Sequence, residues 1–155
     1  METNPKYRSL LSPGSIGKME LKNRMIEAGM GTSLEPLDGT IDDATFDFYV
    51  ERAKGGVALI VTGVAAVDHP HGLSMKNVMG ISDDKYIPGL KRLAEALHQY
   101  GCKLAVQLQH GGKVAMGDYG EGMDLLCPSE HHIGGGEITK DMASTEFPLL
   151  MAQYS

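Results

Sequence analysis

Gln107 carries the group best suited to recognising the edge of a flat ligand. Residues 103–107 (KLAVQ) are predicted to form a β-strand. The alternation, which continues to Gln109, places Gln107 on the face opposite Leu104, Val106 and Leu108. That aliphatic face should pack under helices, so Gln107 should point toward the open mouth of the fold. Its carboxamide both donates and accepts hydrogen bonds, which suits a heterocyclic imide edge. Spacing alone, however, favours the alternative that Gln107 bonds to a neighbouring loop carbonyl, because a buried amide must be paired.

Glycine-rich segments follow two other predicted strands, at residues 24–28 and 57–62. Glycine allows a flat ligand to lie directly against the backbone. The candidate ligand-lining residues are Ala28, Gly29, Met30 and Gly31 after the first strand, and Gly63 after the second. Ordinary turn formation explains the same glycines and is favoured without further observations.

Histidines also occur near these segments, but their spacing does not predict a metal site. His110 follows the third strand and is interpreted as a residue that orients the loop rather than as a proton donor. The pairs His69/His71 and His131/His132 have no cysteine or carboxylate partners at the spacing that metal sites use. Solvated loop histidines are therefore the favoured interpretation.

The elements that must position these residues alternate between strand and helix. Apolar residues at helical spacing, Tyr49 among them, predict a helix from Asp42 or Asp43 to about residue 54. The same spacing predicts a second helix from Ile87 to Leu97. A hairpin is predicted at residues 12–22, before the first strand. Strand–helix–strand alternation indicates parallel pairing with right-handed crossovers, with the helices on one face. The predicted fold is therefore α/β: an incomplete (β/α)8 TIM barrel containing the hairpin and about three β/α units.

The whole chain, residues 1–155, is predicted to be one partial barrel domain. The pattern is recognisable over residues 10–113 and irregular over residues 114–155, where residues 137–142 resemble the start of a helix that Pro148 interrupts. A complete barrel takes roughly 250 residues, so the chain is expected to be an N-terminal part.

Composition excludes several classes of partner. The net charge is −6 and the basic residues are scattered, which argues against nucleic acid and anionic membranes. The longest apolar stretch, residues 57–67, is far shorter than the roughly 20 residues that span a bilayer. Cys102 and Cys127 form no disulfide framework. No secretory signal is visible at the start of the chain, and the chain is expected to be cytoplasmic.

Three segments carry a family resemblance. They are residues 21–32 (LKNRMIEAGMGT), residues 38–67 (DGTIDDATFDFYVERAKGGVALIVTGVAAV) and residues 83–113 (DDKYIPGLKRLAEALHQYGCKLAVQLQHGGK). In type and order they resemble the old yellow enzyme family. The chain looks most like its branch of NADH:flavin oxidoreductases that includes 2-enoate and 2,4-dienoyl-CoA reductases.

The resemblance implies a flavoenzyme that reduces activated alkenes. In that family FMN lies across the barrel mouth, and hydride passes from NAD(P)H through flavin N5 to the β-carbon of an enone, enoate or acyl-CoA substrate. By resemblance, Ala28, Gly29, Met30 and Gly31 line the flavin, and Gly63 meets it from the second strand. Gln107 would bond the pyrimidine edge of the flavin.

The chain departs from the family pattern at three positions. Relatives usually have proline at Gly29, and many have threonine or cysteine at Gly31, where only a backbone N–H remains to face the flavin. In relatives the motif after the third strand commonly ends in arginine, and here it ends in Lys113. The lysine ammonium is a point charge and lacks the planar set of hydrogen-bond donors of a guanidinium.

Other family features are expected beyond residue 155: the residues that anchor the substrate, the basic group near flavin N1 and the phosphate site. The iron–sulfur cluster and FAD domain of larger relatives are not encoded here. The chain alone is therefore expected to be nearly inactive. One alternative is a non-catalytic module whose sheet edges are completed by self-association or by a complementing chain. Another is a barrel that binds a different cofactor.

Overall fold

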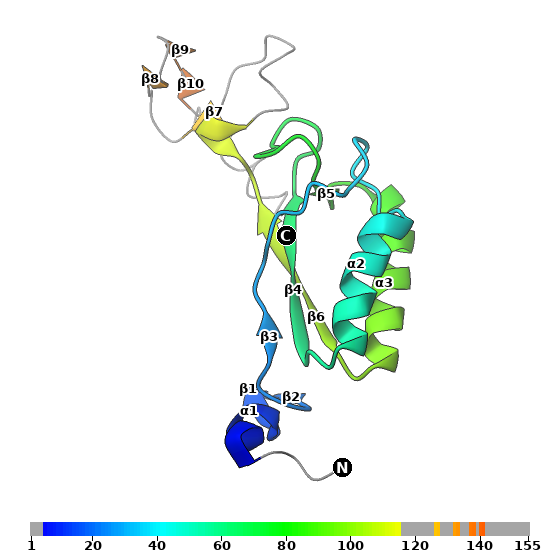
Figure 1. The fold of residues 1–155 in the computed structure, drawn as a ribbon. Helices are drawn as coiled ribbons and strands as arrows, with labels where there is room; N and C mark the ends of the chain where they lie inside the picture. Colours follow the sequence, from blue (N-terminus) through cyan, green and yellow to red (C-terminus); the bar gives the residue numbers. More distant parts are fainter. Residues whose placement is uncertain (1–4, 116–125, 128–131, 134–136, 139, 142–155) are drawn as a thin grey trace.

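The computed structural model describes residues 5–115, 126–127, 132–133, 137–138 and 140–141. Its centre is a parallel sheet in which β4 (Leu59–Ala66) lies between β3 (Ile26–Glu27) and β6 (Lys103–Gln109). Helices α2 (Asp43–Lys54) and α3 (Ile87–Gln99) cover one face of this sheet, as Figure 1 shows. The order of these elements confirms the predicted architecture of an incomplete (β/α) barrel.

The N-terminal segment closes one end of the sheet. It contains η1 (Pro5–Tyr7), α1 (Arg8–Leu11) and the predicted hairpin, formed by antiparallel β1 (Gly14–Ile16) and β2 (Met19–Leu21). Leu21 packs with Ala58 and Leu59 at the start of β4. The open end of the sheet is therefore the opposite one, where β3, β4 and β6 finish.

Local signals fix both helices. The Asp42 carboxylate accepts a hydrogen bond from the Thr45 N–H at 2.9 Å, which caps the start of α2. Gly56 after α2 and Gly101 after α3 have φ of 104° and 63°, values that side chains disfavour. The core between helices and sheet is apolar, and its buried members are Tyr49, Val50, Ala53, Ile60, Ala65, Met79, Leu93, Leu97 and Cys102.

Strand β4 is longer than its apolar run predicts. The expected strand ended at Thr62 with Gly63 in a loop, which is wrong because β4 continues to Ala66. A β-bulge makes the continuation possible: Val61 pairs with Ala105 and Val64 with Gln107. Two residues of β4, Thr62 and Gly63, therefore lie opposite one residue of β6.

Several short elements complete the described residues. Strand β5 (Met79–Gly80) pairs with the end of β4, η2 (Asp84–Tyr86) leads into α3, and η3 (Gly112–Val114) follows β6. Beyond them lie β7 (Leu126–Cys127), β8 (His132–Ile133), β9 (Glu137–Ile138) and β10 (Lys140–Asp141). The sequence predicts the start of a helix at residues 137–142. This is wrong for residues 137–138 and 140–141, which form the strands β9 and β10. Pro148 lies outside the described residues.

Candidate functional site

The Gln107 side chain lies on the face of the sheet opposite the helices. Leu104 and Val106 pack against the helix-side core, and Gln107 is exposed. Leu108, expected on the same face as Leu104 and Val106, is 42% exposed, so the expected packing of Leu108 under the helices is wrong. A Cβ atom placed on Gly29 would lie 3.1 Å from the Gln107 Cδ atom, so the carboxamide lies beside the segment that follows β3. The predicted orientation of Gln107 is confirmed, and its role toward a ligand stays a prediction.

The candidate residues after β3 form an open stretch of backbone. Ala28, Gly29, Met30 and Gly31 are all exposed. A Cβ atom on Gly31 would meet only the end of the flexible Met75 side chain. The structure therefore places residues 28–31 beside Gln107, on the face of the sheet opposite the helices.

Gly29 and Gly63 let the segment after β3 lie directly on the bulge of β4. A Cβ atom on Gly29 would lie 2.8 Å from the Thr62 carbonyl oxygen, and one on Gly63 would lie 2.7 Å from the Met30 carbonyl oxygen. Backbone atoms cannot move aside as a side-chain end can. Gly63 is itself buried. Close packing of backbone against backbone thus explains both glycines, a reason that neither sequence interpretation contained.

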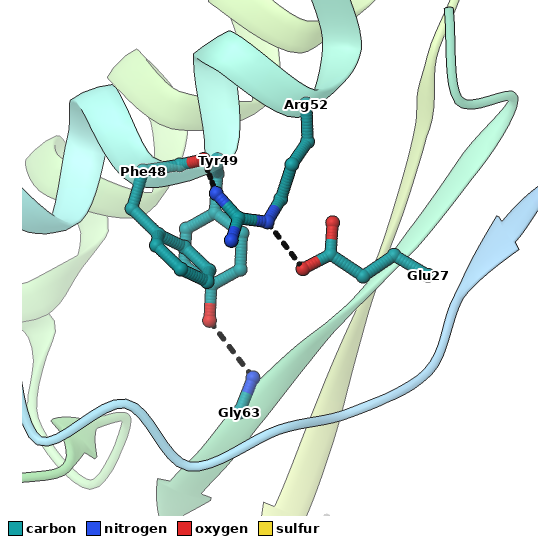
Figure 2. Close-up of polar contacts among 5 residues, drawn as sticks. All are labelled: Glu27, Phe48, Tyr49, Arg52 and Gly63. Carbon is teal, nitrogen blue, oxygen red and sulfur yellow. Dashed lines mark hydrogen bonds and ion pairs between the residues drawn. The ribbon is translucent and has the colours of Figure 1, made fainter. Parts of the chain in front are cut away.

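Side chains satisfy the backbone groups that the bulge removes from the ladder. The Gly63 N–H donates to the Tyr49 hydroxyl at 2.8 Å, shown in Figure 2, and the Gln107 N–H donates to Thr62 Oγ1 at 3.2 Å. The Thr62 hydroxyl in turn donates to the Gly63 carbonyl at 2.7 Å. Sequence reasoning assigned Tyr49 only to an apolar helix face. The residue type could have indicated this hydrogen bond, since the hydroxyl of a buried tyrosine usually needs a partner.

His110 connects the loop after β6 to the loop after β4. Its Nδ1 atom accepts a hydrogen bond from the Gly112 N–H at 3.0 Å, and its Nε2 atom lies 3.7 Å from an Asp68 carboxylate oxygen. The Gly111 N–H donates to the Gly72 carbonyl at 2.7 Å. These contacts fit the interpretation of His110 as a residue that orients the loop.

Two features are absent from the described part of the chain, a metal-binding cluster and a membrane-spanning helix. Within it, His, Cys, Asp and Glu side chains form no group of three or more that could hold a metal ion. Within the same residues, none of the helices combines the length and the apolar character needed to cross a membrane.

Sequence reasoning missed a buried carboxylate in the loop after β3. Glu35 is 3% exposed. The Thr32 hydroxyl donates to its carboxylate at 3.3 Å, and the Asn77 side-chain amide donates to its backbone carbonyl at 2.6 Å. Burial raises the pKa of Glu35, and hydrogen bonds from Thr32 and from backbone N–H groups partly oppose this rise.

Replacing Glu35 with glutamine is expected to stabilise the chain at neutral and alkaline pH. A raised folded-state pKa means that the charged form costs stability once the pH exceeds the unfolded-state pKa, and glutamine has no charge to bury. The advantage should disappear below about pH 4, where the native carboxyl is protonated in both states. Urea unfolding at several pH values measures it, with the exposed Glu95→Gln as control. A stability difference that is independent of pH would contradict the assignment.

Comparison with known proteins places this sequence in a family. Residues 9–152 match the family model of the NADH:flavin oxidoreductase / NADH oxidase family. The chain is 37% identical over 123 residues to the NADH oxidase of Thermoanaerobacter brockii, covering 79% of this chain and 19% of that protein. It is 37% identical over 148 residues to the cinnamate reductase of Clostridium sporogenes, covering 91% of this chain and 22% of that protein.

Solved structures share the fold. A complex of 2-naphthoyl-CoA reductase with 2-naphthoyl-CoA superposes with a TM-score of 0.85 at 24% identity, covering 96% of this chain and 24% of that one. An old yellow enzyme homologue from Zymomonas mobilis gives 0.83 at 22% identity, covering 94% and 43%. Such identities show the fold alone, whereas the family model matches nearly the whole sequence. The chain belongs to the NADH:flavin oxidoreductase / NADH oxidase family.

Proposed function

We propose that this chain supplies the first strands of an FMN-binding barrel that uses NAD(P)H to reduce a C=C bond conjugated to a carbonyl group. FMN and NAD(P)H follow from membership of the family. The observation that carries the proposal is the exposed Gln107 carboxamide beside the open backbone of residues 28–31. The chain spans about a fifth of the length of the NADH oxidase and the cinnamate reductase described above, so we assign the activity to the complete barrel and not to this chain alone.

The residues at this edge fit a flat heterocycle. Gln107 offers both a donor and an acceptor, as an imide edge requires. Ala28, Gly29 and Gly31 add little side-chain bulk to this stretch, whose one large side chain is the exposed Met30. Gly31 can present only its backbone groups. Gly63 would serve the site indirectly, since it is buried and its N–H is bonded to Tyr49. When bound, FMN supplies the hydride-transfer chemistry, and the chain holds and orients it.

The names of the relatives support a class of substrate. One relative is a cinnamate reductase, and one structural neighbour was solved with an aromatic acyl-CoA. An α,β-unsaturated carboxylic acid or its CoA ester is therefore the proposed substrate. The residues that would bind this substrate and donate the proton are not among those assigned in this chain.

A second candidate is a non-catalytic module that needs a complementing chain or a second copy. Among the described strands, β6 pairs only with β4, and no described strand lies along its other edge. Leu108 on this strand is 42% exposed. Later barrel strands, added by such a partner, would pair with this edge. Neither candidate predicts NADH-dependent turnover by the chain alone, so the grafted barrel described next distinguishes them: only the first candidate predicts that it oxidises NADH.

A chimeric protein, called the grafted barrel below, tests the proposal. Residues 9–152 would replace the segment that they match in the Clostridium sporogenes cinnamate reductase. This grafted barrel is expected to retain bound FMN, seen by its absorbance, and to oxidise NADH in the presence of cinnamate. A grafted barrel that is folded by circular dichroism but carries no flavin would refute the proposed function.

A further inference from the structure

One helix, α2, holds both strands that lead into the candidate site (Figure 2). The Tyr49 hydroxyl accepts the Gly63 N–H in the bulge of β4. About one turn later, Arg52 Nε lies 2.9 Å from Glu27 Oε1 in β3. Glu27 directly precedes Ala28, where the candidate flavin-lining stretch begins. The helix therefore sets the positions of the two strands just before the site.

The position of the Tyr49 hydroxyl is determined by packing. Its side chain is buried, and its ring meets Phe48 edge-on with centroids 5.1 Å apart. The Arg52 guanidinium lies 3.2 Å from the centroid of the Phe48 ring and donates to the Phe48 carbonyl at 2.6 Å. The Gly63 N–H is also buried, so without this hydroxyl a backbone donor would lose its partner.

We propose that Tyr49 is a positioning residue for the flavin site and acts through the bulge of β4, an inference that rests on the proposed function. By holding the Gly63 N–H, Tyr49 keeps Thr62 and Gly63 as the bulged pair. Thr62 Oγ1 then accepts the Gln107 N–H. Val64 pairs with Gln107 in the register that this bulge sets. The Gln107 carboxamide therefore stays beside Gly29 on the open face.

Amide hydrogen exchange in the full chain without flavin tests this role. Tyr49→Phe keeps the ring and removes the acceptor, so the amides of Gly63 and Gln107 should exchange about tenfold faster or more. The side-chain amide signals of Gln107 in the NMR spectrum should also shift. The amide of Ile60 should stay protected, which shows that the sheet remains folded. Unchanged exchange at both Gly63 and Gln107 would overturn the inference.

Two further variants sharpen the test. Tyr86→Phe is the matched control, because Tyr86 is buried and its hydroxyl donates to the Asp38 carbonyl at 3.2 Å, not to the bulge. It should leave exchange at Gly63 and Gln107 unchanged. Thr62→Val removes the acceptor of the Gln107 N–H and the donor to the Gly63 carbonyl, but it leaves the Gly63 N–H bonded to Tyr49. It should therefore accelerate exchange at Gln107 more than at Gly63. Equal acceleration by all three variants would overturn a specific role for Tyr49.

The grafted barrel connects the bulge to the cofactor. There, Tyr49→Phe should weaken FMN binding about tenfold and shift the flavin absorbance bands, whereas Tyr86→Phe should do neither. Faster exchange with unchanged FMN affinity and bands would make Tyr49 a purely structural contact and overturn the inference. A grafted barrel that binds no FMN in any version would refute the proposed function, and exchange in the free chain would still decide whether Tyr49 holds the bulge.

Discussion

Replacing Gly63 with alanine is expected to destabilise the chain by about 1–3 kcal/mol, the cost typical of forcing extra atoms into a packed site. The new Cβ atom would lie 2.7 Å from the Met30 carbonyl oxygen. To relieve this collision, the segment after β3 would have to move away from β4. Urea unfolding measures the loss, and the grafted barrel should also lose most of its FMN.

Gly14→Ala provides the matched control for this substitution. The nearest atom to a Cβ atom on Gly14 is Arg24 Cγ at 3.4 Å, which belongs to a flexible side chain. Its effect on stability should stay within about 0.5 kcal/mol. A Gly63→Ala chain as stable as the Gly14→Ala chain would contradict the close backbone packing at the bulge.

Replacing Gln107 with leucine is expected to weaken FMN binding in the grafted barrel by about 10- to 100-fold, the effect of leaving ligand hydrogen-bonding groups unpaired. Because Gln107 is exposed, its loss should change the free energy of unfolding by no more than about 0.5 kcal/mol. The expected result is therefore a defect in binding without a defect in folding. Fluorescence titration of FMN measures the affinity.

Gln99→Leu makes the same chemical change elsewhere. Gln99 is exposed at the end of α3, on the helix side of the sheet, and its replacement should leave FMN affinity unchanged. If Gln107→Leu and Gln99→Leu bind FMN equally well, Gln107 has no contact with the flavin, and the proposed site loses its most specific residue.

The sequence predicts the features of this fold that depend on neighbouring residues. Asp42 and Gly101 mark helix ends because capping acts within a few residues. The orientation of Gln107 is predictable because β6 alternates regularly. The end of β4 is not predictable in this way, since the strand continues through a bulge whose Gly63 N–H bonds to the hydroxyl of Tyr49, fourteen residues earlier.

Two parts of the candidate site depend on contacts between distant segments. Gly29 and Gly63 fit a turn, a ligand surface or close backbone packing equally well until the positions of the Thr62 and Met30 carbonyls are known. Glu35 lies in a loop whose residues are polar or mixed, and nothing in its spacing predicts that the carboxylate is buried. Both cases require tertiary structure.

The most direct measurement follows the side-chain amide signals of Gln107 by NMR while FMN is titrated into the isotopically labelled grafted barrel. If Gln107 and residues 28–31 face a common flat ligand, the Gln107 side-chain signals and the Gly31 amide should shift together and saturate with the flavin absorbance. Saturation by FMN that leaves these signals unmoved would contradict the account, because the flavin would then lie elsewhere.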